Sequence, residues 1–163
     1  ASFVRRSWTF CGRTMTIDSK PFGRIEIDTR QILTFPHGLY GFEHLREFAL
    51  LDSARPPFFW LQSLEEANVA FVLINPYVVR PDYVLESPDE DLEAIGSPEP
   101  EGILVFSIVT IPGGGGEITC NLQGPLLINR SERVGHQSIS LHQAYHTKHP
   151  VLEEMRSARS GSC

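Results

Sequence analysis

The feature that most constrains the fold is a series of short apolar runs separated by Gly, Pro, Asn and Asp. In residues 23–28, polar and apolar side chains alternate with period two, as they do in a half-buried strand. The runs that we expect to form strands are 23–28, 32–35, 48–51, 58–64, 69–75, 103–111, 117–122, 126–129 and 137–142. Short strands with turns between them are typical of an all-β, mostly antiparallel protein, so we expect a small closed or partly open β-barrel.

One short helix is predicted among these strands, over residues 87–96. Ser87 can cap its start with Glu90 completing a capping box, and Pro88 suits the first turn. Gly96 can end the helix, because glycine adopts the left-handed conformation of a helix C-terminus at little cost.

A single domain is expected for a chain of 163 residues. We place it at residues 15–150, because residues 1–14 carry three arginines and no acid and so differ from the rest. Residues 1–14 are interpreted as a flexible extension upstream of a native start of folding near Met15; a transit peptide, which their composition fits slightly better than a secretory signal, is the alternative. Residues 151–163 are interpreted as a flexible C-terminal tail.

The charge balance bears on the class of partner. The chain has 20 acids against 14 Lys and Arg, and only 11 of these bases lie outside the extension. Residues 86–101 hold seven acids and no base. A nucleic-acid binder needs clustered bases that neutralise phosphates, so no direct nucleic-acid binding is expected. An acidic surface suits a basic protein partner instead.

The cysteines and the apolar runs bear on the compartment. Cys11, Cys120 and Cys163 lie far apart and form no Cys-x-x-Cys motif, so neither a disulfide framework nor a zinc site is expected. This usage fits a reduced, cytoplasmic setting. Ser107 and Thr110 interrupt the longest apolar stretch far short of the ~20 residues of a membrane helix, so no membrane association is expected.

Three histidines, His142, His146 and His149, form the pattern most similar to a metal site. On a continuous helix their spacing would place all three on one face, and a histidine-bound metalloenzyme is therefore one alternative. Pro150 disfavours helical geometry at the preceding residue, and residues 138–142 alternate as a strand does, so solvent-facing histidines are the favoured interpretation.

The run of four glycines at residues 113–116 is the other pattern that suggests chemistry. A phosphate-binding loop would need a helix after it, whereas a strand-like segment follows, so we interpret the run as a hairpin tip and expect no nucleotide or other cofactor. No nucleophile elbow or other catalytic grouping is found in the sequence. The residues thus indicate a binding module and not an enzyme.

Four segments carry a family resemblance. They are Ile32 to Glu43 (ILTFPHGLYGFE), Phe59 to Leu64 (FWLQSL), Asn75-Pro76 with Asp82-Tyr83 beyond, and Asn121 to Asn129 (NLQGPLLIN) followed by Gly135-His136-Gln137. In this order and spacing they resemble the bacterial flagellar assembly factor family FliW, over about residues 22–150.

The resemblance implies a small β-barrel protein without enzymatic activity. It implies that the protein binds the RNA-binding translational regulator CsrA and also flagellin, and that it relieves the repression of flagellin translation by CsrA. We expect it to be a monomer when free. An alternative in the same class is a flagellin chaperone with no role in translation.

The candidate partner-binding residues lie on the motifs that carry the resemblance. They are Pro36, Gly38, Leu39, Tyr40, Phe42, Leu61, Gln62, Ser63, Asn121, Pro125 and Asn129. Each also has a structural explanation: positive φ for the glycines, core packing for the phenylalanines, and a strand end for the proline. Gln62 would point out of the barrel, and Asn121, Asn129 and Gln137 would satisfy backbone groups at strand ends. No catalytic or metal-binding residue is expected.

Overall fold

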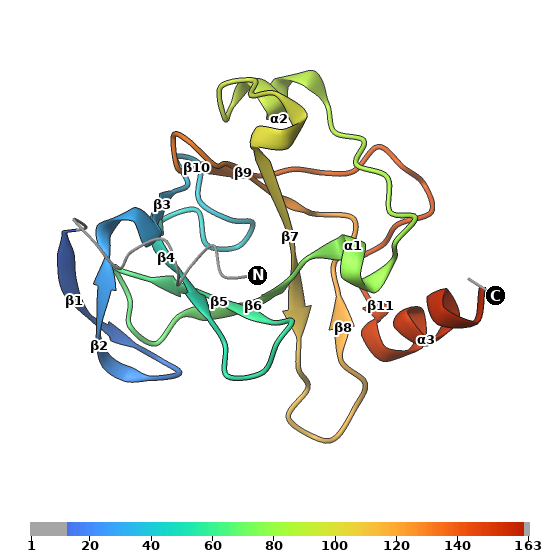
Figure 1. Ribbon diagram of the computed structural model, residues 1–163, viewed down its shortest axis with the longest axis horizontal. Coiled ribbons are helices and arrows are strands. Elements are labelled where there is room, and N and C mark those ends of the chain that lie inside the picture. Colours follow the sequence, from blue (N-terminus) through green and yellow to red (C-terminus); the bar gives the residue numbers. More distant parts are fainter. Residues whose placement is uncertain (1–12, 162–163) are drawn as a thin grey trace.

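The computed structural model describes residues 13–161, and its centre is a closed, mixed barrel of seven strands (Figure 1). Around the barrel the strands are β3 (Ile32–Thr34), β4 (Glu47–Asp52), β5 (Phe59–Ser63), β6 (Ala70–Ile74), β7 (Ile103–Thr110), β9 (Leu126–Asn129) and β10 (Val134–Gln137). Neighbouring strands are antiparallel except β10 and β3, which are parallel and close the barrel where Val134 pairs with Thr34. The predicted all-β, mostly antiparallel barrel is confirmed.

Two small additions extend the barrel (Figure 1). The hairpin of β1 (Thr14–Ser19) and β2 (Gly23–Asp28) packs Ile17 and Ile27 on Ala49 and Leu51 of β4. Strand β8 (Thr119–Cys120) pairs with the end of β7, and β11 (His149–Pro150) pairs with β8. The four glycines lie in the turn between β7 and β8, as expected for a hairpin tip. Of the predicted extension at residues 1–14, residues 1–12 lie outside the described residues, and Thr14 is the first residue of β1.

Within residues 13–161, three α-helices and two 3-10 turns lie around the barrel. They are α1 (Pro76–Val79), α2 (Asp89–Glu93), α3 (Val151–Gly161), and the 3-10 turns at Thr29–Gln31 and Pro100–Gly102. Helix α2 is the predicted helix, and Gly96 ends this segment at φ 89°. The predicted capping box is wrong: the N-cap is Pro88, which has no side-chain cap, and the Ser87 hydroxyl instead forms a hydrogen bond with the Ser138 hydroxyl at 2.9 Å.

The segment after Pro150 forms helix α3, where the sequence suggested a flexible tail. Val151 is 1% exposed, and the half-buried Met155 packs against the same apolar cluster. Near its start, Glu154 accepts a hydrogen bond from His149 at 2.6 Å. An apolar anchor and a polar anchor within one turn hold the helix against the domain.

Residues 137–142 differ from the predicted strand in an informative way. Strand β10 ends at Gln137, although the N–H groups of Ser138 and Ser140 still donate to the carbonyls of Pro125 and Gln123. The alternation is therefore real, but it is inverted: Ser138 and Ser140 are buried, while Ile139 is 51% and Leu141 is 59% exposed.

Candidate partner-binding site

The turn at residues 35–42 places its side chains on opposite sides of the backbone. The N–H of Gly38 donates to the carbonyl of Phe35 at 2.8 Å, and the N–H of Phe42 donates to the carbonyl of Leu39 at 2.7 Å. Gly38 and Gly41 have φ values of 66° and 87°, as expected from their spacing. Leu39 is 1% exposed and belongs to the barrel core, whereas Tyr40 is 58% exposed. Tyr40 is thus the aromatic residue that this turn presents outward.

The backbone of Tyr40 is fixed by a buried glutamine on strand β10, 97 positions away in the sequence. The Tyr40 N–H donates to Oε1 of Gln137 at 2.9 Å, and Nε2 of Gln137 donates to the carbonyl of Gly124 at 3.1 Å. Oδ1 of Asn121 accepts the N–H groups of Gln123 and Gly124. One amide side chain therefore joins the turn at residue 40 to the loop at residues 121–124. Gln137 is a positioning residue that the candidate set lacked, although it lies on a recognised motif.

A shallow hollow of about 270 Å³ forms where these segments meet. Its lining residues, which we name the Tyr40 surface, are Tyr40, Asn121, Gln123, Gly124, Ile139 and Thr147. Two predicted residues, Tyr40 and Asn121, thus come together across 81 positions of the chain with Ile139 between them in the same hollow. Ile139 was expected in a strand and was not among the candidate contact residues. The feature that identifies it is the alternation in residues 138–141, in which the serines are buried and the apolar side chains are exposed.

Acidic helix α2 lies within electrostatic reach of this surface. Burial raises the pKa of Tyr40, and the negative charge of Asp91 raises it further. Asp91 itself is held by Nε2 of His136 at 3.0 Å and by the hydroxyl of Ser138 at 2.7 Å. Apolar and acidic groups therefore lie side by side at this end of the barrel.

Strand β5 holds three of the predicted contact residues away from solvent. Leu61, Gln62 and Ser63 are each 0% exposed. Gln62 does point away from the barrel core, but its Oε1 accepts the N–H of Lys20 at 2.8 Å and its Nε2 donates to the carbonyl of Ala67 at 3.0 Å. Leu61 belongs to the barrel core, and Oγ of Ser63 accepts the N–H groups of Glu65 and Glu66. These side chains therefore offer no surface to a partner.

The remaining candidates divide between structure and surface. Asn129 is 5% exposed; its Nδ2 donates to the carbonyl of Ile95 and its Oδ1 accepts two backbone N–H groups, which is the strand-end role expected for it. Pro125 is buried. Pro36 is exposed, and Phe42 is half-buried with its ring edge-on to Phe71 at 5.1 Å. Only part of the predicted set can be touched directly.

The three histidines do not converge on a metal position. The rings of His146 and His149 stack with centroids 3.8 Å apart, and Nδ1 of His142 accepts the N–H of Ala144. His149 is buried, with Nε2 accepting the N–H of His146 at 2.9 Å, and burial lowers the pKa of its imidazole. Among residues 13–161, no group of three or more His, Cys, Asp and Glu side chains is arranged to hold a metal ion.

Cys120 has no features of a nucleophile. It is 1% exposed, and burial raises the pKa of its thiol to about 12, so the thiolate is scarce at neutral pH. In the part of the chain that the structure describes, no helix is long and apolar enough to cross a membrane.

The fold and the site together define a small mixed β-barrel protein with an exposed apolar surface beside an acidic helix. A family model described as FliW protein matches residues 16–152. The flagellar assembly factor FliW of Treponema denticola is 45% identical over 144 residues, covering 88% of this chain and 98% of that protein. FliW of Thermotoga neapolitana is 42% identical, covering 87% and 97%. A crystal structure of the flagellar assembly factor FliW matches with a TM-score of 0.76 at 34% identity, covering 84% of this chain and 96% of that one.

The chain belongs to the FliW family of flagellar assembly factors. The resemblance found in the sequence motifs is thereby confirmed. The family is one of flagellar assembly factors and is not a known enzyme family.

Proposed function

We propose that this protein is a non-enzymatic, cytoplasmic flagellar assembly factor that acts by binding two other proteins, CsrA and flagellin. When it holds CsrA, flagellin translation is released from repression. When flagellin accumulates, it displaces CsrA and repression returns. Family membership supports this assignment, and a stoichiometric binding protein needs no cofactor. We propose that the free protein is a monomer.

The observation that carries the proposal is the Tyr40 surface. Tyrosine is enriched at protein interfaces, because it contributes a large, rigid contact area at a low cost in conformational entropy. Here Tyr40 is exposed while its backbone is fixed by Gln137, so little further ordering is needed on binding. Ile139 adds exposed apolar area to the same hollow.

The charge of the chain supports a basic partner. An excess of acids over bases, concentrated beside the Tyr40 surface at helix α2, attracts a basic RNA-binding protein and repels nucleic acid. We therefore expect the protein to bind CsrA itself and not the RNA that CsrA binds.

The test compares surface variants with a matched control. We expect Tyr40→Ala and Ile139→Lys to weaken binding to CsrA or to flagellin by about tenfold or more in calorimetric titrations, as truncation of an interface anchor does. Leu152→Ala, at a residue that is 61% exposed on helix α3, is the control and should leave both affinities unchanged. Unfolding in urea shows that each variant remains folded.

The outcomes separate the site from the function. If both surface variants bind CsrA and flagellin as tightly as the wild type, the Tyr40 surface is not the interface. The function is tested by adding wild-type protein to a preformed complex of CsrA and RNA. Release of RNA supports the regulator, whereas binding of flagellin without any effect on CsrA would leave a flagellin chaperone.

A further inference from the structure

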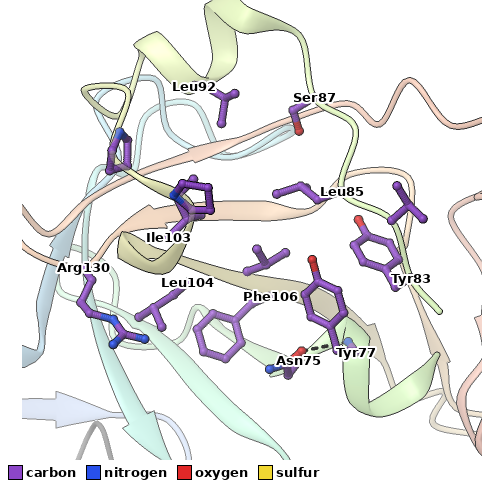
Figure 2. A pocket seen from close by; sticks show the side chains of 14 residues that line it. Asn75, Tyr77, Tyr83, Leu85, Ser87, Leu92, Ile103, Leu104, Phe106 and Arg130 are labelled. Carbon is purple, nitrogen blue, oxygen red and sulfur yellow. Dashed lines mark hydrogen bonds between the residues drawn. The ribbon is translucent and has the colours of Figure 1, made fainter. Parts of the chain in front are cut away.

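A second hollow, of about 720 Å³, lies on the outside of the barrel beside the first half of β7 (Figure 2). We name it the β7 groove. It is lined by Asn75, Tyr77, Tyr83, Val84, Leu85, Ser87, Leu92, Pro98, Pro100, Ile103, Leu104, Val105, Phe106 and Arg130. Figure 2 shows the side chains of Leu85 and Leu92 on the side of the groove that faces Leu104 and Phe106. None of its lining residues belongs to the Tyr40 surface, so the two hollows are separate.

One edge of β7 is open along this groove. On one side, β7 pairs with β9 over residues 103–106 and then with β8. On the other side, β6 pairs only with residues 107–109, because the chain leaves the sheet at Asn75 and enters helix α1. Residues 103–106 therefore lack a neighbouring strand on the side of β6.

The polar backbone groups of Val105 point to this open edge. The N–H of Asn121 donates to the carbonyl of Ile108, and the N–H of Arg130 donates to the carbonyl of Gly102, so the even-numbered residues face β8 and β9. Because backbone groups alternate between the two edges of a strand, those of Val105 face the groove. Within residues 13–161 no hydrogen bond reaches the N–H or C=O of Val105. A ligand that supplies an acceptor for this N–H and a donor for this C=O would gain binding free energy from both hydrogen bonds.

The surroundings of the groove indicate the charge of such a ligand. Six exposed acids alternate along the chain with lining residues of the groove: Glu86, Asp89, Glu90, Glu93, Glu99 and Glu101. In the described part of the chain none of the six forms an ion pair. These carboxylates favour a ligand that carries lysine or arginine.

We propose that the β7 groove is a second docking site, in which an extended peptide segment of a partner protein adds as a strand to residues 103–106. The segment pairs with the backbone of Val105, places alternate apolar side chains against Leu85 and Ile103, which pack in the same apolar cluster, and carries basic residues at its ends. Strand addition of this kind takes its affinity from main-chain hydrogen bonds and its specificity from side-chain pockets. The inference does not depend on the identity of the partner at the Tyr40 surface.

The experiment uses the full chain and a synthetic eight-residue peptide in which valine and threonine alternate between terminal lysines. Binding is followed by calorimetry and by the exchange of the Val105 amide proton in NMR. We expect the peptide to bind and to slow exchange at Val105. A peptide with glutamate in place of lysine should bind at least tenfold more weakly. Two further peptides are N-methylated at alternate residues, so that each lacks the N–H groups along one of its two edges. The peptide methylated on the edge that faces β7 should lose binding, and the peptide methylated on the other edge should keep it.

Two matched protein variants locate the site. Val84→Lys introduces a cation at a groove residue that is 45% exposed. We expect this variant to bind the lysine-ended peptide at least tenfold more weakly. Ile139→Lys makes the same chemical change at a residue of the Tyr40 surface that is 51% exposed, and it should leave peptide binding unchanged. No binding of the lysine-ended peptide at millimolar concentration, or binding with unchanged exchange at Val105, would overturn the proposal.

Discussion

At Gly38 even a methyl group would enter the space of the loop that follows. A Cβ atom there would lie 2.6 Å from Cα of Glu43 and 2.7 Å from the carbonyl oxygen of Phe42, both backbone atoms that cannot rotate away. Gly41, in the same turn, also has positive φ, but its Cβ would meet nothing within 4 Å. Substitution at Gly41 therefore tests backbone strain alone, whereas substitution at Gly38 tests backbone strain together with steric overlap.

We expect Gly41→Ala to lower the free energy of unfolding by about 1–2 kcal/mol, the cost of a left-handed conformation for alanine. Gly38→Ala should cost at least ~1–3 kcal/mol more, because backbone must also move. Urea denaturation of the two variants measures the difference. Equal losses for both would show that the loop yields at Gly38 without cost.

His149 makes stability depend on pH at the level of one side chain. Its Nδ1 lies 2.6 Å from Oε2 of Glu154, and its Nε2 accepts a backbone N–H, so the folded state requires neutral imidazole with its proton on Nδ1. Burial, as the largest cause, lowers its pKa below the ordinary value of 6.5, although the nearby Glu154 acts in the opposite direction. The unfolded chain thus binds this proton more readily than the folded protein does.

The sign of the effect follows from linkage. The contribution of His149 to stability is present above pH 6.5 and is lost as the pH falls through the lower pKa of the folded state. We expect His149→Gln to be less stable than the wild type at pH 8, and its stability to fall less steeply as the pH falls below 6.5. Denaturation at several pH values checks this, and parallel pH profiles would contradict it.

The motif at residues 35–42 shows how far single residues can be predicted. Gly38 and Gly41 had to adopt positive φ in a turn after a strand, and the structure confirms it. Which aromatic side chain faces solvent depends on the hydrogen bond from Tyr40 to Gln137, 97 positions away, which no local pattern contains. Gln137 does satisfy backbone groups, as expected from the sequence, but the same distance in sequence hides that these groups belong to Tyr40 and Gly124.

Helix α3 shows a different limit at the level of elements. Residues 151–161 have no counterpart among the motifs that carry the family resemblance, so the sequence alone indicated a tail. The helix is held mainly by Val151 and Met155, two side chains that find an apolar cluster built by other elements. Tertiary packing, and not local preference, decides the state of this segment.

Neighbouring residues on α3 provide a direct comparison. Val151 is 1% exposed and Leu152 is 61% exposed. We expect Val151→Ala to lower the free energy of unfolding by about 2 kcal/mol, through lost apolar burial and a residual cavity, and Leu152→Ala to change it by less than ~0.5 kcal/mol. Thermal or urea unfolding measures both. Similar, small effects for the two would show that the helix contributes nothing to the domain.

For residues 137–142 the extended conformation was predicted correctly, but the side of the segment that faces the core was not. The alternation of apolar and polar side chains correctly indicated an extended segment, and it was natural to assign the apolar side to the core. Ser138 is instead buried because its hydroxyl donates to Asp91, which leaves Ile139 outside. An extended segment whose apolar side faces solvent is a sign of an interface that becomes readable only once the fold is known.

For the whole molecule, net charge governs encounters more than it governs the fold. The formal charge is −6, and seven acids without a base fall within residues 86–101. We expect the association rate with a basic partner such as CsrA to fall steeply as the salt concentration rises, since screening shortens the range of attraction to about 10 Å at 0.1 M. The dissociation rate should change much less.

Stopped-flow measurements over a range of salt concentration test this expectation. Replacing Glu90 and Glu93 by Gln removes two exposed charges and should flatten the salt dependence while leaving the fold unchanged. Leu152→Ala serves again as a neutral control. An association rate that is the same at low and high salt would exclude steering by the acidic surface.

The single parallel pairing of the barrel also sets an order of events in the cell. On the edge of β3 that faces away from β4, Thr34 pairs with Val134 on β10, about a hundred positions later in the chain. While the ribosome is still making the middle of the protein, β3 therefore has one unsatisfied edge and the cylinder stays open. Closure comes late and joins distant parts of the chain, which is the slow kind of folding step. A chain that stops short of β10 would present a permanent strand edge to the quality-control machinery of the cell.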